Sequence, residues 1–173
     1  MNSFDERAAT WDDPTKIERA AVVARTIGET IHLDPAMRVL EYGAGTGLVS
    51  QALREHVGPV TLVDTSAGMR DVMADKVARG VIPDARIWNL DLSTDEPPNE
   101  QFDLIVTVLT LHHIPDIAPV LAACAALLAD GGRVCIVDLE SEDGSFHGDA
   151  FEGHRGFDPA ALTALLDAAG FAD

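Results

Sequence analysis

Three glycines at alternate positions form the clearest candidate for a ligand site in this sequence. Gly43, Gly45 and Gly47 follow a short apolar segment that ends in an acid, Glu41. Because glycine lacks a Cβ atom, a loop with this spacing can turn tightly and let a ligand lie directly on the backbone. The pattern of strand, loop and helix around it therefore predicts a binding site, with a purely structural turn as the alternative.

Two other acids end predicted strands in the same way. Asp64 ends the second predicted strand and Asp91 the third. An acid at the first position can hold the hydroxyls of a ribose, and one at the second can meet the amine of an adenine. The alternatives are a helix cap for Asp64 and a turn residue for Asp91. Because the carboxyl ends of parallel strands converge on one crevice, we expect Glu41, Asp64 and Asp91 to meet there.

The apolar pattern around these residues predicts alternating helices and strands. Helices are predicted at 17–31, 48–55, 67–77, 117–130 and 160–169, and strands at 37–43, 59–66, 85–93, 102–111 and 132–140. Ser66 and Asp158 are expected to cap the helices that follow them, and Gly170 is expected to end the last helix. This alternation predicts a doubly wound α/β fold with a mostly parallel, Rossmann-like sheet.

Composition and charge exclude several classes of function. The chain has 173 residues and a formal net charge of −17, because 29 acidic residues outnumber 12 basic ones. Such a charge repels a phosphate backbone, so nucleic acid is not expected as a substrate. No apolar run reaches the roughly 18 residues that span a bilayer, so no membrane partner is expected. Cys124 and Cys135 lie in apolar segments and predict buried free thiols in a cytoplasmic protein.

Five segments together resemble a known enzyme family. They are VLEYGAGTG, LVDTSAGM, NLDLS, FDLIVTVLTLHHIPD and LLADGGRVCIVDLE, and they cover about residues 37–140. In order and spacing they resemble class I S-adenosylmethionine-dependent methyltransferases, most closely the branch of ubiquinone and menaquinone biosynthesis. The resemblance implies S-adenosylmethionine as cofactor and a small molecule as methyl acceptor. A protein that binds the cofactor without catalysis is the alternative, while an NAD-dependent dehydrogenase would need a G-x-G-x-x-G loop.

The resemblance also implies roles for residues near the first two strands. The loop of Gly43, Gly45 and Gly47 would lie along the methionine part of the cofactor. Glu41 would steady that loop. Asp64 would hold the ribose, and Thr65, the next residue, would border it.

Residues farther along the chain would meet the adenine and the amino group of the cofactor. Met69 would pack on the adenine face, although its helical spacing equally suits a core residue. Asp91 and the backbone of Leu92 would read the adenine edge. The backbone near Thr107 would accept a hydrogen bond from the amino group of the cofactor.

Histidines are the only candidates for catalytic groups. His112 and His113 follow the fourth strand, beside the expected methyl position. One of them would act as a general base or orient the acceptor, but the alternative, in which HHIP only shapes the loop, is favoured. His147, Asp149, Glu152 and His154 lie in a polar insert and could together bind a metal. No metal is expected, because His-x6-His in a loop is not a recognised ligand spacing.

A single domain, residues 1–173, is expected to have four parts. They are an N-terminal helical arm or lid at 1–34, a cofactor-binding core at 37–140, a substrate-side insert at 141–157 and a last helix at 158–173. Phe4 and Trp11 in the arm either cover the cofactor or only pack the arm. The family's sheet has two more strands after the last helix, so we expect a truncated chain with an exposed fifth strand. A partner that covers this edge, as in a dimer, is the alternative, and the oligomeric state stays open.

Overall fold

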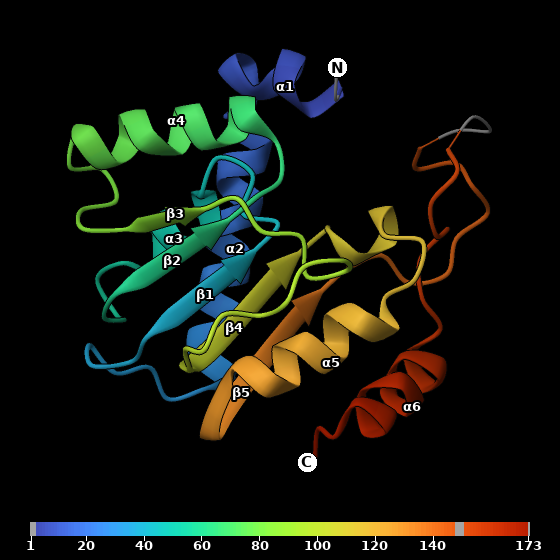
Figure 1. The fold of residues 1–173 in the computed structure, drawn as a ribbon. Coiled ribbons are helices and arrows are strands. Elements are labelled where there is room, and N and C mark those ends of the chain that lie inside the picture. Colours follow the sequence, from blue (N-terminus) through green and yellow to red (C-terminus); the bar gives the residue numbers. More distant parts are fainter. Residues whose placement is uncertain (1–2, 148–150, 173) are drawn as a thin grey trace.

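A five-stranded sheet forms the centre of the molecule (Figure 1). The structure is a computed structural model that describes residues 3–147 and 151–172. The strands are β1 (Val39–Tyr42), β2 (Val60–Val63), β3 (Arg86–Trp88), β4 (Phe102–Val108) and β5 (Leu128–Val137). They lie in the order β3-β2-β1-β4-β5, and each neighbouring pair is parallel. The order reverses between β1 and β4, which confirms the predicted doubly wound fold and its switch point.

Helices cover both faces of this sheet. They are α1 (Ser3–Arg7), η1 (Ala8–Thr10), α2 (Pro14–Thr30), α3 (Leu48–Leu53), α4 (Ala67–Ala78), η2 (Leu111–His113), α5 (Ala118–Leu127) and α6 (Pro159–Ala169). On one face Ala20 of α2, Val49 of α3 and Met73 of α4 share an apolar core. On the other face α5 and α6 pack over a second core that includes Leu121 (Figure 1). Because both faces are covered, all residues of β1 and β2 are buried.

Helix ends follow the local signals in the sequence. The Ser66 hydroxyl accepts a hydrogen bond from the backbone N–H of Met69 at 3.2 Å, at the start of α4. The Asp158 carboxylate accepts from the backbone N–H of Ala161 at 2.9 Å, at the start of α6. Gly170 ends α6 with a φ of 98°, a left-handed conformation that favours glycine. All three predicted caps are therefore confirmed.

The third strand is shorter than its apolar pattern predicts. It ends at Trp88, whereas the prediction runs over 85–93. Beyond the strand, the Asp91 carboxylate accepts from the backbone N–H and the hydroxyl of Ser93, at 3.0 and 2.6 Å. The N–H of Asp91 donates to the Asp95 carboxylate at 2.9 Å. These local bonds compete with strand pairing, so Asp91 is a turn residue three positions after the strand rather than its last residue.

The boundary between α5 and β5 also differs from the prediction. The helix ends at Leu127 instead of continuing to residue 130. Leu128 already belongs to β5 and pairs with Phe102 of β4. Gly131, with a φ of 74°, therefore lies within the strand and does not close the helix. An apolar run of alanine and leucine suits a buried helix and a buried strand equally, so pairing with β4 decides the boundary.

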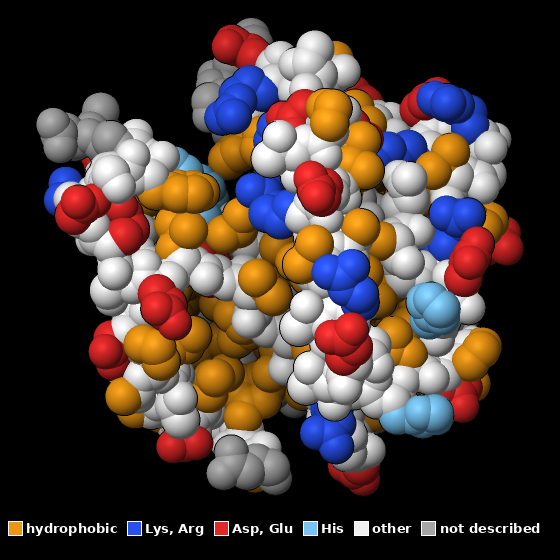
Figure 2. All heavy atoms as spheres, turned by 180° about the vertical axis from the view of Figure 1, so that it is seen from behind, with side chains coloured by type: hydrophobic (Ala, Val, Ile, Leu, Met, Phe, Trp, Pro, Cys, Tyr) orange, Lys and Arg blue, Asp and Glu red, His pale blue; other side chains and the backbone are white. Residues whose placement is uncertain are grey.

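The edge strand β5 is less covered than the central strands. None of its ten residues is fully buried, and Cys135 and Val137 are half-buried on the face of α2. Figure 2 shows, from behind, a hollow lined by hydrophobic side chains. Within the described residues β5 pairs with β4 alone. No helix in residues 3–147 and 151–172 is long and apolar enough to cross a membrane.

Candidate active site

A cavity of about 390 Å³ opens at the carboxyl ends of β1, β2 and β4. Its size falls within the range of pockets that bind small molecules, roughly 300–1,000 Å³. The residues that line it and were predicted at a cofactor site are Glu41, Gly43, Gly45, Asp64, Thr65, Met69 and Asp91. The structure thus brings most of the predicted positions to one place.

The three glycines of the loop share one backbone conformation but differ in what surrounds them. All three have positive φ angles, which other residues rarely adopt. A Cβ atom on Gly43 would lie 2.2 Å from Cγ2 of Thr110, and one on Gly47 would lie 2.9 Å from Cδ1 of Ile82. A Cβ atom on Gly45 would lie 3.6 Å from the indole nitrogen of Trp11, at an ordinary contact distance. Gly47 therefore serves core packing and does not line the cavity, whereas Gly43 and Gly45 do.

Glu41 connects β1 to the helix after the loop. Its carboxylate accepts a hydrogen bond from the backbone N–H of Ser50 in α3 at 2.9 Å. The residue is 3% exposed, and burial raises the pKa of its carboxyl to about 7 despite the bond to Ser50 and the nearby ammonium of Lys76. The bond fixes Glu41 to the helix that follows the glycine loop, and the steadying role of Glu41 stays a prediction.

Asp64 connects the glycine loop to the loop after β2. One of its carboxylate oxygens accepts from the N–H of Gly45 at 2.7 Å, and the other accepts from the N–H of Ser66 at 2.8 Å. Burial raises the pKa of this carboxyl, while the two backbone donors lower it. Each carboxylate oxygen can accept a second hydrogen bond, so Asp64 can still bind a hydroxyl in the cavity.

Besides Gly47, two predicted positions lie outside the cavity wall. Leu92 is 2% exposed and belongs to the core on the α5 side. Thr107 is 3% exposed and lies within β4, opposite Tyr42 of β1. The wall begins one residue later, at Val108.

The wall next to β4 includes a strained residue that the sequence did not indicate. Leu109 has a φ of 51°, and its N–H donates to the carbonyl of Val137 at 2.7 Å. A non-glycine residue in this region costs roughly 1–3 kcal/mol and tends to occur at functional sites. Thr110 follows and donates from its hydroxyl to the Gly43 carbonyl at 3.3 Å, so this turn braces the glycine loop. This contact joins two distant segments, so it is visible only in the folded structure.

The N-terminal arm forms part of the cavity wall. Phe4 and Trp11 both line it and meet edge to face with ring centroids 5.8 Å apart. Asp5 accepts from the Ser66 hydroxyl at 2.6 Å. Asp12 forms a hydrogen bond with the Thr46 hydroxyl and an ion pair of 2.7 Å with the ammonium of Lys76. The arm is therefore fastened to the loops after β1 and β2 as well as to α4.

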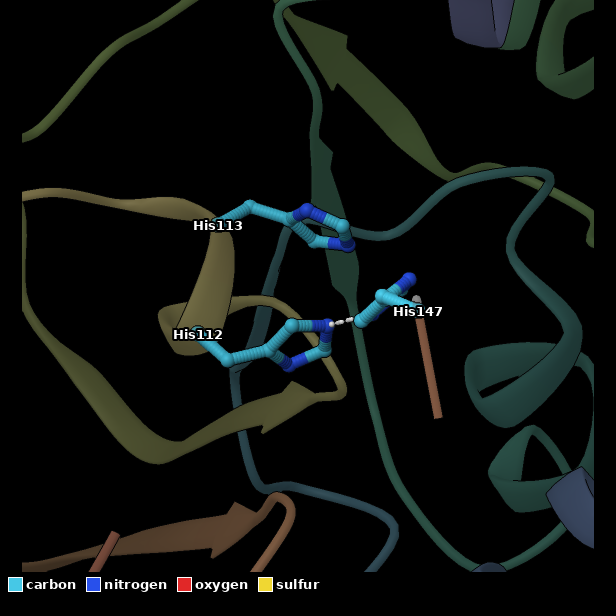
Figure 3. Close-up of side chains that lie close together, drawn as sticks. All are labelled: His112, His113 and His147. Atoms are coloured by element: carbon cyan, nitrogen blue, oxygen red, sulfur yellow. Dashed lines mark hydrogen bonds between the residues drawn. The ribbon is translucent and has the colours of Figure 1, made fainter. Parts of the chain in front are cut away.

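Three histidines lie close together beside the cavity (Figure 3), and His113 is the one among them that lines it. His112 is 1% exposed, and its Nδ1 donates to the Asp138 carboxylate at 2.6 Å. Its Nε2 lies 2.9 Å from Nε2 of His147, which comes from the insert. His113 lines the cavity, and burial together with the neighbouring His112 and His147 lowers the pKa of its imidazole to about 4. Asp138 directly follows β5 and was missed, although it carries the same signal as Glu41, Asp64 and Asp91, an acid at the carboxyl end of a predicted strand.

A further residue of the insert, His154, contacts the segment after β4. His154 donates its backbone N–H to the His112 carbonyl at 2.8 Å, and its Nε2 lies 3.2 Å from the Pro115 carbonyl oxygen. Asp149 lies outside the described residues. The insert thus docks on the turn after β4, although its two predicted histidines face different partners.

Comparison with known proteins adds family relationships to this geometry. The model of the family described as "Methyltransferase domain" matches residues 15–173. An uncharacterized methyltransferase of Schizosaccharomyces pombe is 31% identical over 146 residues, 75% of this chain and 51% of that protein. A ubiquinone biosynthesis O-methyltransferase of Xanthomonas axonopodis pv. citri is 29% identical over 152 residues, 84% of this chain and 63% of that protein. The chain thus spans between half and two thirds of the length of these curated relatives.

A solved structure supports the same relationship. The complex of DhpI with SAH is 26% identical and superposes with a TM-score of 0.74. It covers 96% of this chain and 83% of that one. The alternation of five parallel strands and flanking helices is therefore shared over nearly the whole chain.

Proposed function

The chain belongs to the methyltransferase domain family, and on that premise we propose that it transfers the methyl group of S-adenosylmethionine to a small organic molecule. One observation carries the proposal. Two carboxylates that line the same cavity, those of Glu41 and Asp64, accept hydrogen bonds from the backbone N–H groups of Ser50 and Gly45, just after the glycine loop and within it. An adenosyl cofactor needs such a site, with open backbone for its methionine part and an acid for its ribose.

In this proposal the cofactor lies across the carboxyl ends of the central strands. Its methionine part follows Gly43 and Gly45, and its ribose binds Asp64 beside Thr65. Met69, at 1% exposure, and the turn at Asp91 border the adenine.

For two of the predicted cofactor contacts, those of Leu92 and Thr107, we assign neighbouring residues that line the cavity. Leu90 and Ser93 line the cavity where Leu92 does not, so they replace it beside the adenine. The carbonyls that receive the amino group are those of Val108, the last residue of β4, and Leu109, which lie next to the predicted Thr107.

Methyl transfer from a sulfonium requires little covalent chemistry from the protein. The acceptor attacks the methyl carbon in line, the carbon–sulfur bond breaks, and its electron pair returns to sulfur to leave S-adenosylhomocysteine. Alignment of the two reactants can supply roughly 7–11 kcal/mol of the barrier, and enclosure excludes competing water. The arm with Phe4 and Trp11, which line the cavity, provides that enclosure.

The acceptor is a small molecule, and an oxygen is its methylated atom. The net charge of −17 disfavours polyanionic substrates. The Xanthomonas relative is an O-methyltransferase, which favours an oxygen acceptor. Two free cysteines, Cys124 and Cys135, support a reducing cytoplasm as the place of action.

Thermal unfolding with added ligands tests the proposal. S-adenosylmethionine and S-adenosylhomocysteine should raise the Tm, with a stabilisation of about 2.7 kcal/mol at a hundredfold excess over Kd, whereas NAD should not. Turnover to S-adenosylhomocysteine is then measured against a panel of phenols, catechols and other hydroxylated metabolites. Stabilisation by NAD, or by none of the three ligands, would reject the cofactor. Binding without any turnover would leave a cofactor-binding protein.

A further inference from the structure

Three histidines from distant segments converge beside the cavity. His112 and His113 belong to η2, and His147 lies 34 positions beyond the second of them, in the insert. One ring nitrogen of each lies within 4.8 Å of those of the other two. Figure 3 shows the three rings turned toward one another. Four-coordinate zinc with Zn–N bonds of about 2.0–2.1 Å needs its ligand nitrogens about 3.3 Å apart, so side-chain shifts of about 1 Å would close the cluster around an ion.

Asp138 sets the orientation of the most buried ring. Its carboxylate accepts from Nδ1 of His112 and from the backbone N–H groups of Leu111 and Leu139, at 2.9 and 2.8 Å. With its proton on Nδ1, His112 presents the lone pair of Nε2 to His147. Carboxylate, imidazole and ion are arranged in this way around most histidine-bound metals, because the carboxylate fixes the ring and raises its basicity.

We propose that His112, His113 and His147 bind a divalent transition-metal ion of the zinc class. Imidazole nitrogens suit zinc, copper, nickel and iron rather than magnesium or calcium. The Nε2 atoms of His112 and His147 lie 2.9 Å apart and are joined by one hydrogen bond, which bonds to the ion would replace. His113 lines the cavity, so the fourth coordination position faces the space where an acceptor would lie. Three histidines with one open position are typical of catalytic rather than structural zinc.

The consequence for catalysis rests on the proposed function. An acceptor hydroxyl bound at the open position would lose its proton to solvent, because a zinc-class ion lowers the pKa of bound oxygen. The resulting oxygen anion would attack the methyl carbon, and the electron pair of the carbon–sulfur bond would go to sulfur. The site therefore selects acceptors with a hydroxyl that can reach the ion.

Metal binding is measured on the full chain without a histidine tag, after chelator treatment and without methyl donor. Zinc titration by calorimetry should give one ion per chain, and cobalt should give the visible absorption of a four-coordinate site. His147→Ala should weaken zinc binding at least about 100-fold, and Asp138→Asn about 10–100-fold. His154→Ala is the matched control, since it removes an insert histidine whose Nε2 faces the Pro115 carbonyl oxygen.

The variants keep the proposal falsifiable. His147 is exposed, so its loss should leave the fold intact even where His112→Ala unfolds the chain. The proposal fails if the chain binds no ion at a Kd below about 10 µM, or if His147→Ala and His154→Ala bind zinc equally well. Affinity for S-adenosylhomocysteine is measured in parallel on the same samples. Failure of that binding would reject the proposed function and leave the metal site standing, and the reverse also holds.

Discussion

The two ends of the cavity are built by different kinds of contact. At the end proposed for the cofactor, side chains hold the backbone: Asp64 accepts from the N–H of Gly45, and Glu41 accepts from the N–H of Ser50. At the end proposed for the acceptor, side chains hold one another, from Asp138 through His112 to His147. The first end draws on neighbouring segments of one strand–loop–helix unit and the next strand. The second joins three segments that are distant in the chain.

This difference predicts how each end responds to change. The glycines of the loop and the carboxylates of Glu41 and Asp64 fix a backbone geometry that has no alternative arrangement of similar energy. Substitutions of these residues should therefore reduce stability and cofactor affinity together. A partly exposed side-chain cluster can lose a member without moving the backbone. Substitutions there should change metal binding and turnover while cofactor affinity stays constant.

The largest effect is expected at Gly43. Gly43→Ala would force a positive φ on alanine and press its Cβ against Thr110, so the free energy of unfolding should fall by about 2–5 kcal/mol. Gly80→Ala is the matched control, because Gly80 has a φ of 70° with nothing within 4 Å of the added atom. The control should cost only about 1–2 kcal/mol in urea unfolding. Equal losses would show that contact with Thr110 does not matter.

The pH dependence of stability tests the burial of Glu41. Its pKa is raised from 4.5 to about 7 in the fold, so the folded chain keeps a proton that the unfolded chain has already released. The free energy of unfolding should therefore fall as pH rises from 4.5 to 7, by up to about 3 kcal/mol.

Glu41→Gln should remove this component of the pH dependence. Urea unfolding of both proteins at pH 5 and pH 7.5 measures it. Glu29→Gln, at an exposed position of α2, should leave the pH dependence of the wild type intact. A Glu41→Gln protein with the unchanged wild-type slope would contradict the raised pKa.

Cofactor affinity should depend on Asp64. Asp64→Ala removes charge-assisted hydrogen bonds worth about 1.5–3 kcal/mol, so the Kd for S-adenosylhomocysteine should rise at least about tenfold. Calorimetry measures it beside Asp103→Ala, which removes an acid paired with Arg38 on the surface. Unchanged affinity in Asp64→Ala would refute the ribose role, and a comparable loss in Asp103→Ala would point to a general effect.

The smallest effect on stability and cofactor affinity is expected at the acceptor end. His147→Phe keeps an aromatic ring against Phe151, with which His147 now stacks at 4.0 Å between centroids. The free energy of unfolding should change by less than about 0.5 kcal/mol, and the Kd for S-adenosylhomocysteine should stay within about twofold. Turnover should fall with an active acceptor. A large loss of cofactor affinity would mean that the two ends are not separate.

Local chemistry explains why much of the fold was predictable. Ser66 and Asp158 cap helices through their own nearest neighbours, and strong apolar periodicity identifies the central strands. The errors occur where two local structures compete, as at the turn of Asp91. The sequence also could not predict which residues line the cavity, because Leu92 and Thr107 lie only one position away in the chain from residues that do line it.

The amino-acid sequence by itself determined the alternation of strands and helices, the glycine loop with its acids and the family, because each depends on residues close together in the chain. Only the tertiary structure decided that Gly47 serves packing, that Leu109 is strained, and that His147 meets His112. Contacts between distant segments depend on how strands pair and how the insert docks. No spacing along a single chain encodes the distance between two imidazoles that lie 35 residues apart.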